Sequence, residues 1–174
     1  MALFILPHRM LVGRLKRMAK EIERKFLVQD DGWRNSVIEE IRIRQAYIAS
    51  MDDRSIRVRL ANDTTATLTV KIGRDLVRDE FEYAIPVADA EQLLSAAVGV
   101  EIAKTRHRVP YKGFIWEVDV FDGLLQGLTV AEVEMRRVDD EPDLPEWLGE
   151  EVTGQHRYSN QALAMRFESE DPGL

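Results

Sequence analysis

The stretch "EIERKFLV", residues 21–28, places charged and apolar side chains at alternate positions. Glu21, Glu23 and Lys25 are spaced two apart, while Ile22 and Phe26 fall in the other register. Side chains two apart on a β-strand point to the same face, so the stretch predicts a strand with two carboxylates and an ammonium on one face. Such a face is either the wet side of an ordinary sheet or a site that needs these charges together.

The same alternation continues along most of the chain. It predicts further strands over residues 43–48, 55–60, 67–72, 78–85, 103–109, 116–121 and 131–135. With residues 21–28 these make about eight consecutive strands, mostly joined by short polar or glycine-containing turns. Short connections favour antiparallel pairing, because parallel neighbours need longer crossovers.

Two segments have helical rather than strand periodicity. Residues 87–98 place leucines at helical spacing, with Asp89 as a candidate N-cap, and residues 154–167 predict a closing helix. The proline-rich stretch between the last strand and that helix, residues 140–151, is expected to be a loop with a short helical turn. The predicted fold class is therefore α+β, mainly β.

Composition sets broad limits on the protein. The chain has 174 residues, enough for one domain, and no cysteine, so any metal must be held by oxygen or imidazole ligands. The net charge is −7, yet the first 20 residues contain five basic residues and no acidic one. We expect residues 1–17 to be a basic, disordered extension or a product of an upstream start, and residues 18–170 to form the domain. The acidic body argues against nucleic-acid partners, and no apolar run is long enough for a membrane span; a cytoplasmic location is expected.

The charged registers of the predicted strands are segregated by sign. Acidic pairs occur at residues 21/23, 117/119 and 132/134, and basic pairs at residues 57/59 and 104/106. Like charges so close repel unless opposite charge lies between them. A closed eight-stranded antiparallel barrel with these faces inward resolves the repulsion, because acidic strands can hold a divalent cation and basic strands a polyanion. The apolar faces would then point outward, covered by helices or by a partner subunit, which makes a homodimer plausible.

The stretch "EIERKFLV" also resembles the Glu-x-Glu-x-Lys signature of the CYTH superfamily, the triphosphate tunnel metalloenzymes. The likeness continues in order through "QAYI", "IRVRL", "LTVKIG", "RDEFEYAIP", "KTRHRV", "WEVDVFDG", "GLTVAEVE" and "EVTGQHRYSNQALA". It covers residues 19–166 and is nearest to the short bacterial triphosphatases. The resemblance implies a closed tunnel of eight antiparallel strands with a charged lumen and helices packed outside.

The resemblance also implies roles for individual residues. The implied metal ligands, for Mg²⁺ or Mn²⁺ with two ions per site, are Glu21, Glu23, Asp119, Glu132 and Glu134, with Glu117 as an additional candidate. The implied phosphate-binding residues are Lys25, Arg57, Arg59, Lys71 and Arg106, and Arg157 could reach the tunnel from the last helix. Lys25, Lys104 and Tyr47 are the candidate catalytic residues. The C-terminal phosphate-binding lysine of the family has no obvious counterpart here.

The expected reaction is metal-dependent hydrolysis of a triphosphate, first of all inorganic tripolyphosphate to pyrophosphate and phosphate. Thiamine or nucleoside triphosphate hydrolysis and adenylate cyclisation remain alternatives within the family. A non-catalytic polyphosphate-binding module is the alternative from another class, and the full acidic set argues against it. A P-loop is excluded because the sequence has no Gly-x-x-x-x-Gly-Lys-[Ser/Thr] motif.

Overall fold

The computed structural model describes residues 22–73, 79–135, 137 and 139–166, and its main feature is one large antiparallel sheet. The strands are β1 (Glu23–Val28), β2 (Glu39–Ser50), β3 (Arg54–Ala61), β4 (Thr65–Ile72), β5 (Asp79–Ile85), β6 (Val98–Tyr111), β7 (Phe114–Phe121), β8 (Thr129–Glu134) and β9 (Leu148–Glu151). The α-helices are α1 (Val87–Ser95) and α2 (Asn160–Met165), and the 3-10 turns are η1 (Arg34–Ser36), η2 (Gly123–Leu125) and η3 (His156–Tyr158). None of the helices in this part of the chain is long and apolar enough to cross a membrane.

The sheet has nine strands and is not closed by hydrogen bonds, so the prediction of a closed eight-stranded barrel is wrong. Its order is β5-β4-β3-β2-β6-β7-β8-β1-β9, which leaves β5 and β9 as the two edges. The additional strand is β9, in the proline-rich stretch expected to be a loop; it pairs with β1 through Phe26 and Glu151. The alternation of side chains does not require closure, because a curved open sheet separates its two faces equally well.

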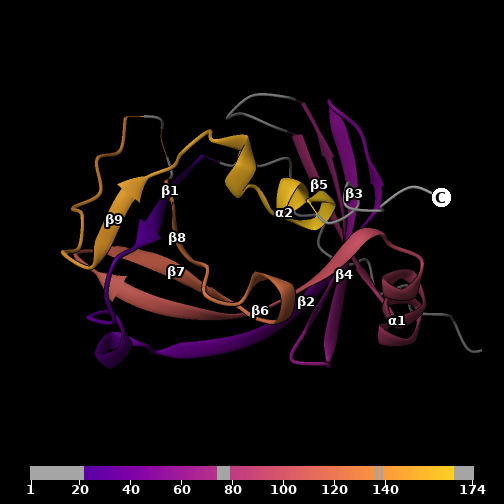
Figure 1. Ribbon diagram of the computed structural model, residues 1–174, viewed down its shortest axis with the longest axis horizontal. Coiled ribbons are helices and arrows are strands. Elements are labelled where there is room, and N and C mark those ends of the chain that lie inside the picture. Colours follow the sequence, from indigo (N-terminus) through magenta and orange to yellow (C-terminus); the bar gives the residue numbers. More distant parts are fainter. Residues whose placement is uncertain (1–21, 74–78, 136, 138, 167–174) are drawn as a thin grey trace, which may run out of the picture.

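The sheet nevertheless curves strongly around α2 (Figure 1). The long strands β2 and β6 run through the bend, and the pairing register of β2 shifts at Tyr47 against both of its neighbours. Such irregularities insert an unmatched residue, bend the strand and increase its twist. The bend turns β3, β4 and β5 to face β1, β8 and β9 across a concave space, with α2 between them (Figure 1).

The convex face is apolar and is covered by segments of the chain itself. Ala90 and Leu94 of α1 are buried against Val58 and Leu60 of β3. At the other half of the sheet, Trp33, Trp147 and Leu148 cover Phe26, Trp116, Val118 and Val133. The expected N-cap Asp89 lies instead in the first turn of α1, and Pro86 occupies the N-cap position without a side-chain hydrogen bond.

Helix α2 lies on the concave face, which corrects the expectation that the helices pack outside. Its Leu163 and Ala164 are buried against Tyr47, Ile102 and Phe121, in the apolar part of that face. Gly99 on β6 allows the close approach, because a Cβ built at Gly99 would lie 2.4 Å from the carbonyl oxygen of Ala164. The helix is therefore packed into the space that a barrel lumen would occupy.

Replacing Gly99 by alanine is expected to destabilise the protein more than the same change at Gly113. Both glycines have positive φ, +73° and +85°, so both variants carry backbone strain of about 1–2 kcal/mol. Nothing lies within 4 Å of a Cβ at Gly113, whereas at Gly99 the backbone of α2 must also move. Urea denaturation of the two variants measures the difference, and equal losses of unfolding free energy would contradict this account of α2 packing.

Candidate active site

The strand registers bring the predicted site residues of the described chain onto the concave face. Cross-strand partners share a face: the pairs Glu23–Glu134, Lys25–Glu132, Glu132–Glu117 and Arg106–Asp119 connect β1, β8, β7 and β6, and the pair Tyr47–Arg57 connects β2 and β3. Arg59 and Lys71 follow in the same alternation on β3 and β4. Glu21 lies outside the described residues.

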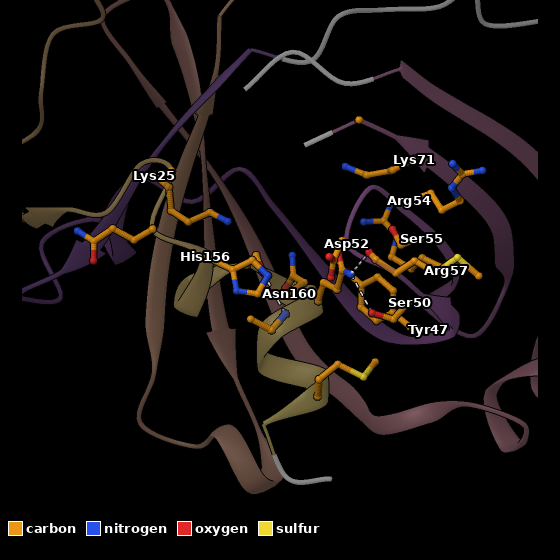
Figure 2. Close-up of a pocket in the computed structure, with 18 of the residues that line it drawn as sticks. Lys25, Tyr47, Ser50, Asp52, Arg54, Ser55, Arg57, Lys71, His156 and Asn160 are labelled. Atoms are coloured by element: carbon orange, nitrogen blue, oxygen red, sulfur yellow. Dashed lines mark hydrogen bonds between the residues drawn. The ribbon is translucent and has the colours of Figure 1, made fainter. Parts of the chain in front are cut away.

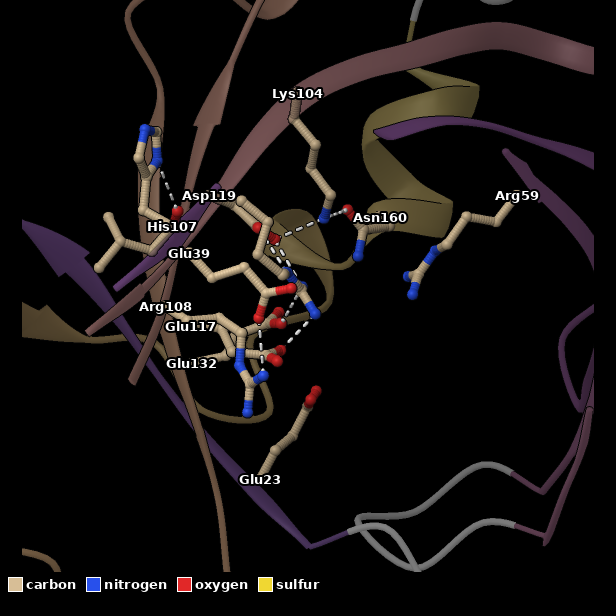
Figure 3. Close-up of polar contacts among 12 residues, drawn as sticks. Glu23, Glu39, Arg59, Lys104, His107, Arg108, Glu117, Asp119, Glu132 and Asn160 are labelled. Carbon is tan, nitrogen blue, oxygen red and sulfur yellow. Dashed lines mark hydrogen bonds and ion pairs between the residues drawn. The ribbon is translucent and has the colours of Figure 1, made fainter. Parts of the chain in front are cut away.

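Arg106 is the centre of an ion-pair cluster on β6, β7 and β8. Figure 3 shows its carboxylate partners Glu117, Asp119 and Glu132. Its Nε and Nη2 donate to the two oxygens of Asp119 at 2.7 and 2.8 Å, and Nη2 also donates to Glu132 at 3.0 Å. Its Nη1 donates to Glu117. Burial opposes the charge on Arg106, but attraction to these carboxylates is stronger and raises its pKa well above the ordinary value. One guanidinium thus contacts three carboxylates and compensates part of their charge.

The carboxylates of β7 and β8, Glu117, Asp119 and Glu132, form an acidic wall of the concave face. Two lysines complete the compensation of its charge. Lys25 Nζ lies 2.8 Å from Glu132 Oε1 and 3.9 Å from Glu23 Oε1. Burial raises the pKa of the Glu132 carboxyl, but Lys25 and Arg106 outweigh burial and hold that pKa far below its usual range. Lys104 Nζ lies 2.5 Å from Asp119 Oδ2, and Lys104 and Arg106 together lower the Asp119 pKa against the effect of burial. These carboxylates are therefore ionised at neutral pH.

Lys104 is enclosed rather than open to the concave space. Its side chain has no exposed area, its Nζ also donates to Asn160 Oδ1 at 3.2 Å, and it lies 5.2 Å from the ring centre of Phe121. Burial lowers the pKa of Lys104 to about 8, opposed by attraction to Asp119. The first residue of α2 therefore covers this candidate catalytic lysine.

The opposite wall, on β3 and β4, holds two arginines of β3 with little compensation. Arg57 is 6% exposed; its Nη2 donates to Thr69 at 3.2 Å, and among the described residues its ion-pair partner is Glu80, with an oxygen 4.0 Å away. Arg59 donates from Nε and Nη2 to Gln45 Oε1, both at 3.2 Å. Burial and repulsion from Arg57 and Arg106 lower the pKa of Arg59 to about 10. Positive charge is thus concentrated on this wall.

A cavity of about 710 Å³ lies between the two walls (Figure 2). From the sheet it is lined by Glu23 and Lys25 on one side and by Tyr47, Arg57 and Lys71 on the other. The β2–β3 turn and the segment from Val152 to Met165, which contains α2, supply most of the remaining lining, among them Asp52, His156 and Asn160 (Figure 2). Lys71 Nζ lies 2.9 Å from Glu80 Oε2. The volume suits a small, highly charged ligand.

The donor chemistry fits a hard divalent cation, but no assembled cage is present in the described part of the chain. The carboxylates of the concave face supply only oxygen ligands, the type that Mg²⁺ and Mn²⁺ prefer. Among residues 22–73, 79–135, 137 and 139–166, no group of three acidic or histidine side chains is close enough to hold an ion. Glu23 and Glu134 are direct cross-strand partners outside the Arg106 cluster, which makes them the best-placed pair.

Three other basic residues lie apart from the site, and one of them, Arg157, is a phosphate-binding candidate from the sequence. Arg157 is exposed, stacks 4.8 Å from the ring centre of Tyr158 and donates to Gln155, so it is not brought to the phosphate-binding set. Arg24 pairs with Glu151 at 2.7 Å. His107 packs on Trp33 at 4.8 Å between ring centres, next to the convex apolar cluster.

Sequence reasoning missed three neutral residues that hold the charged ones. Gln45 contacts Arg59, Thr69 contacts Arg57 and Asn160 contacts Lys104. Gln45 and Thr69 stand two residues before Tyr47 and Lys71, in the same strand register. That spacing could have placed Gln45 and Thr69 on the concave face. It could not have identified them as contacts of the arginines, because neutral polar residues do not contribute to the charge pattern of a strand.

Comparison with known proteins assigns the chain to a family. The model of the CYTH domain matches residues 19–167. The chain belongs to the CYTH-domain family. Within it, the chain is 41% identical over 148 residues to the inorganic triphosphatase of Acetivibrio thermocellus, covering 84% of this chain and 94% of that protein. It is 39% identical over 150 residues to the inorganic triphosphatase of Nitrosomonas europaea, covering 83% and 97%.

The fold agrees with that of a CYTH relative of known structure. A solved structure of the inorganic triphosphatase NE1496 has a TM-score of 0.62 to this chain at 36% sequence identity. The match covers 85% of this chain and 96% of the other. Both comparisons therefore extend over nearly the whole length of the relatives, and the concave face lies within the shared region.

Two partly buried arginines, Arg106 and Arg59, are expected to respond differently to the same substitution. Arg106→Gln leaves three carboxylates without their shared cation and is expected to cost about 3–5 kcal/mol of unfolding free energy. Arg59→Gln removes a cation held only by an amide, so stability is expected to change by less than about 1 kcal/mol or to rise. Urea denaturation of both variants without added metal makes the comparison. A loss at Arg59 as large as at Arg106 would contradict the assignment of compensated and uncompensated walls.

Proposed function

We propose that this CYTH protein hydrolyses inorganic tripolyphosphate to pyrophosphate and orthophosphate with a divalent metal ion. Its two relatives at about 40% identity are named inorganic triphosphatases. The observation that carries the proposal is the pairing of an ion-compensated acidic wall with a cationic wall across one cavity. A polyphosphate chain needs several positive contacts along its length, and arginine forks match phosphate oxygens.

The cations have three different roles in this proposal. Arg57, Lys71 and Lys25 line the cavity and would contact phosphate oxygens directly. Arg59 is partly buried one alternation further along β3 and adds an uncompensated charge. Arg106 and Lys104 are engaged with carboxylates, so they act by holding the acidic wall in place.

Mg²⁺ or Mn²⁺ is the proposed cofactor, and Glu23 and Glu134 are the proposed first ligands. Glu21, two residues before Glu23 in the sequence, is a further proposed ligand. When bound, such an ion neutralises phosphate charge and acidifies a bound water. The chain itself binds the substrate, orients it and keeps its negative charge matched. Two ions per site, and ligation by Glu117, Asp119 and Glu132, remain predictions.

The proposed reaction is attack of a water oxygen on the terminal phosphorus. A new phosphorus–oxygen bond forms as the bond to the bridging oxygen breaks, pyrophosphate leaves, and the proton of the water is released to solvent or to a nearby base. Such a transition state is stabilised by fixed cations around the terminal and bridging oxygens. Lys25 is the best-placed side chain for this, because it lines the cavity and is fixed by Glu132.

Phosphate release from tripolyphosphate, ATP and thiamine triphosphate with Mg²⁺ or Mn²⁺ tests the proposal. We expect turnover to require the metal and to be fastest with tripolyphosphate. Glu23→Gln removes a proposed ligand while keeping the side-chain shape, and its activity is expected to fall at least about tenfold with a higher metal requirement. Glu91→Gln, on the convex side in α1, is the control for loss of one charge and should retain parental activity.

Several results would decide against the proposal. Binding of tripolyphosphate without turnover under either metal would indicate a polyphosphate-binding module. Faster turnover of thiamine triphosphate or ATP would change the substrate class, and release of pyrophosphate with a cyclic nucleotide from ATP would indicate a cyclase. Full activity of Glu23→Gln would remove Glu23 from the metal site.

A further inference from the structure

Gln45 is a fully buried polar residue at the bend of the sheet. Its exposed fraction is 0%, and it lies on β2 between Ile102 of β6 and Arg59 of β3. The pairing register of β2 is regular up to Gln45 on the β6 side and shifts immediately after it. In its pairing with β6, Gln45 therefore occupies the last regular position of β2 before the chain turns toward the cationic wall.

The amide of Gln45 has one defined orientation. Its Oε1 accepts from both Nε and Nη2 of Arg59 at 3.2 Å, and the reversed amide would point N–H groups at N–H groups. Its Nε2 is buried and has no hydrogen-bond partner among the described residues. A buried donor without a partner costs about 1–3 kcal/mol, so an apolar residue would be more favourable here unless the contact to Arg59 has a function.

Arg59 differs from the other cations of the concave face in the kind of acceptor it contacts. Carboxylate oxygens lie at 2.8 Å from Lys25, 2.7 Å from Arg106, 2.5 Å from Lys104, 2.9 Å from Lys71 and 4.0 Å from Arg57. Within the described residues, Arg59 has no carboxylate oxygen within 4.0 Å and is held by a neutral amide. Its Nη1 is not used by the contact to Gln45.

We propose that Gln45 is a positioning residue for substrate binding, which fixes the guanidinium plane of Arg59 without neutralising its charge. The proposal rests on the proposed triphosphatase function and adds a specific role for a neutral residue within it. A carboxylate at position 45 would form a stronger pair with Arg59, but the substrate would then have to compete with it. An apolar residue at position 45 would leave the charge of Arg59 unchanged but would no longer fix the orientation of its guanidinium plane.

Gln45→Glu and Gln45→Met separate charge from orientation. Tripolyphosphate binding is measured by calorimetry without added metal, and KM and kcat are measured with Mg²⁺ at low and high ionic strength. Gln45→Glu is expected to weaken binding and raise KM at least about tenfold, with a smaller change in kcat and a flatter salt dependence, because one site charge is neutralised. Gln45→Met is expected to raise KM less and to keep the parental salt dependence.

Two controls keep the result interpretable. Gln92→Glu makes the same charge change on α1, on the convex side, and should leave binding and KM unchanged. The unfolding temperature of Gln45→Glu should equal or exceed that of the parent, because the new carboxylate pairs with Arg59. A purely structural role of Gln45 would instead lower that temperature without a selective effect on KM.

The outcomes are distinct. Gln45→Glu that is folded and binds tripolyphosphate within about twofold of the parent would overturn the inference. So would Gln45→Met binding more weakly than Gln45→Glu, because packing rather than preserved charge would then dominate. If the parent itself bound no tripolyphosphate, the proposed function would fail first and this inference with it. Binding by the parent without hydrolysis would refute the triphosphatase reaction but leave the expected ranking of the Gln45 variants in force.

Discussion

The contact of one arginine with three carboxylates underlies the rest of the structure. Asp119 and Glu117 project from β7 and Glu132 from β8, and without Arg106 these like charges would repel across adjacent strands. Lys25 from β1 and Lys104 from β6 extend the compensation to both sides. Four neighbouring strands can therefore place acidic residues on one buried face and still pair in register.

The carboxylates of the acidic wall are neutralised by their own cations. The arginines of the opposite wall, on β3, therefore remain available to an anionic ligand. Arg57 and Arg59 are held by Thr69 and Gln45, which accept hydrogen bonds without cancelling charge. The protein as a whole has a net charge of −7, so attraction of a polyanion cannot come from its overall field. In the proposed function it comes from this local separation, in which the acidic groups are already paired, Arg57 lies 4.0 Å from a Glu80 oxygen, and Arg59 is held by an amide.

Local spacing predicted the faces of the strands, but not the global arrangement. Alternation over two residues is a property of each strand, so residues such as Arg57, Asp119 and Glu132 could be assigned to a common face from the sequence. Closure depends on whether distant edges meet, and β9 forms only through its long-range pairing with β1. The helical periodicity of residues 154–167 predicted a closing helix but not which side of the sheet it covers. Gln45, Thr69 and Asn160 are neutral, and only their contacts reveal them.

Lys104 is a candidate catalytic residue from the sequence, but α2 covers it and separates it from the cavity. Lys104 lies in the charged register, yet its side chain has no exposed area because Asp119 and Asn160 enclose its ammonium group. A ligand in the cavity meets Asn160 before it could meet Lys104. In this arrangement Lys104 fixes Asp119, and Asp119 in turn orients Arg106, so the lysine acts on the cavity through two intervening side chains. Direct contact of Lys104 with a substrate would require Asn160, the first residue of α2, to move away from it, while the other end of the helix is packed on β6 through Ala164 and Gly99.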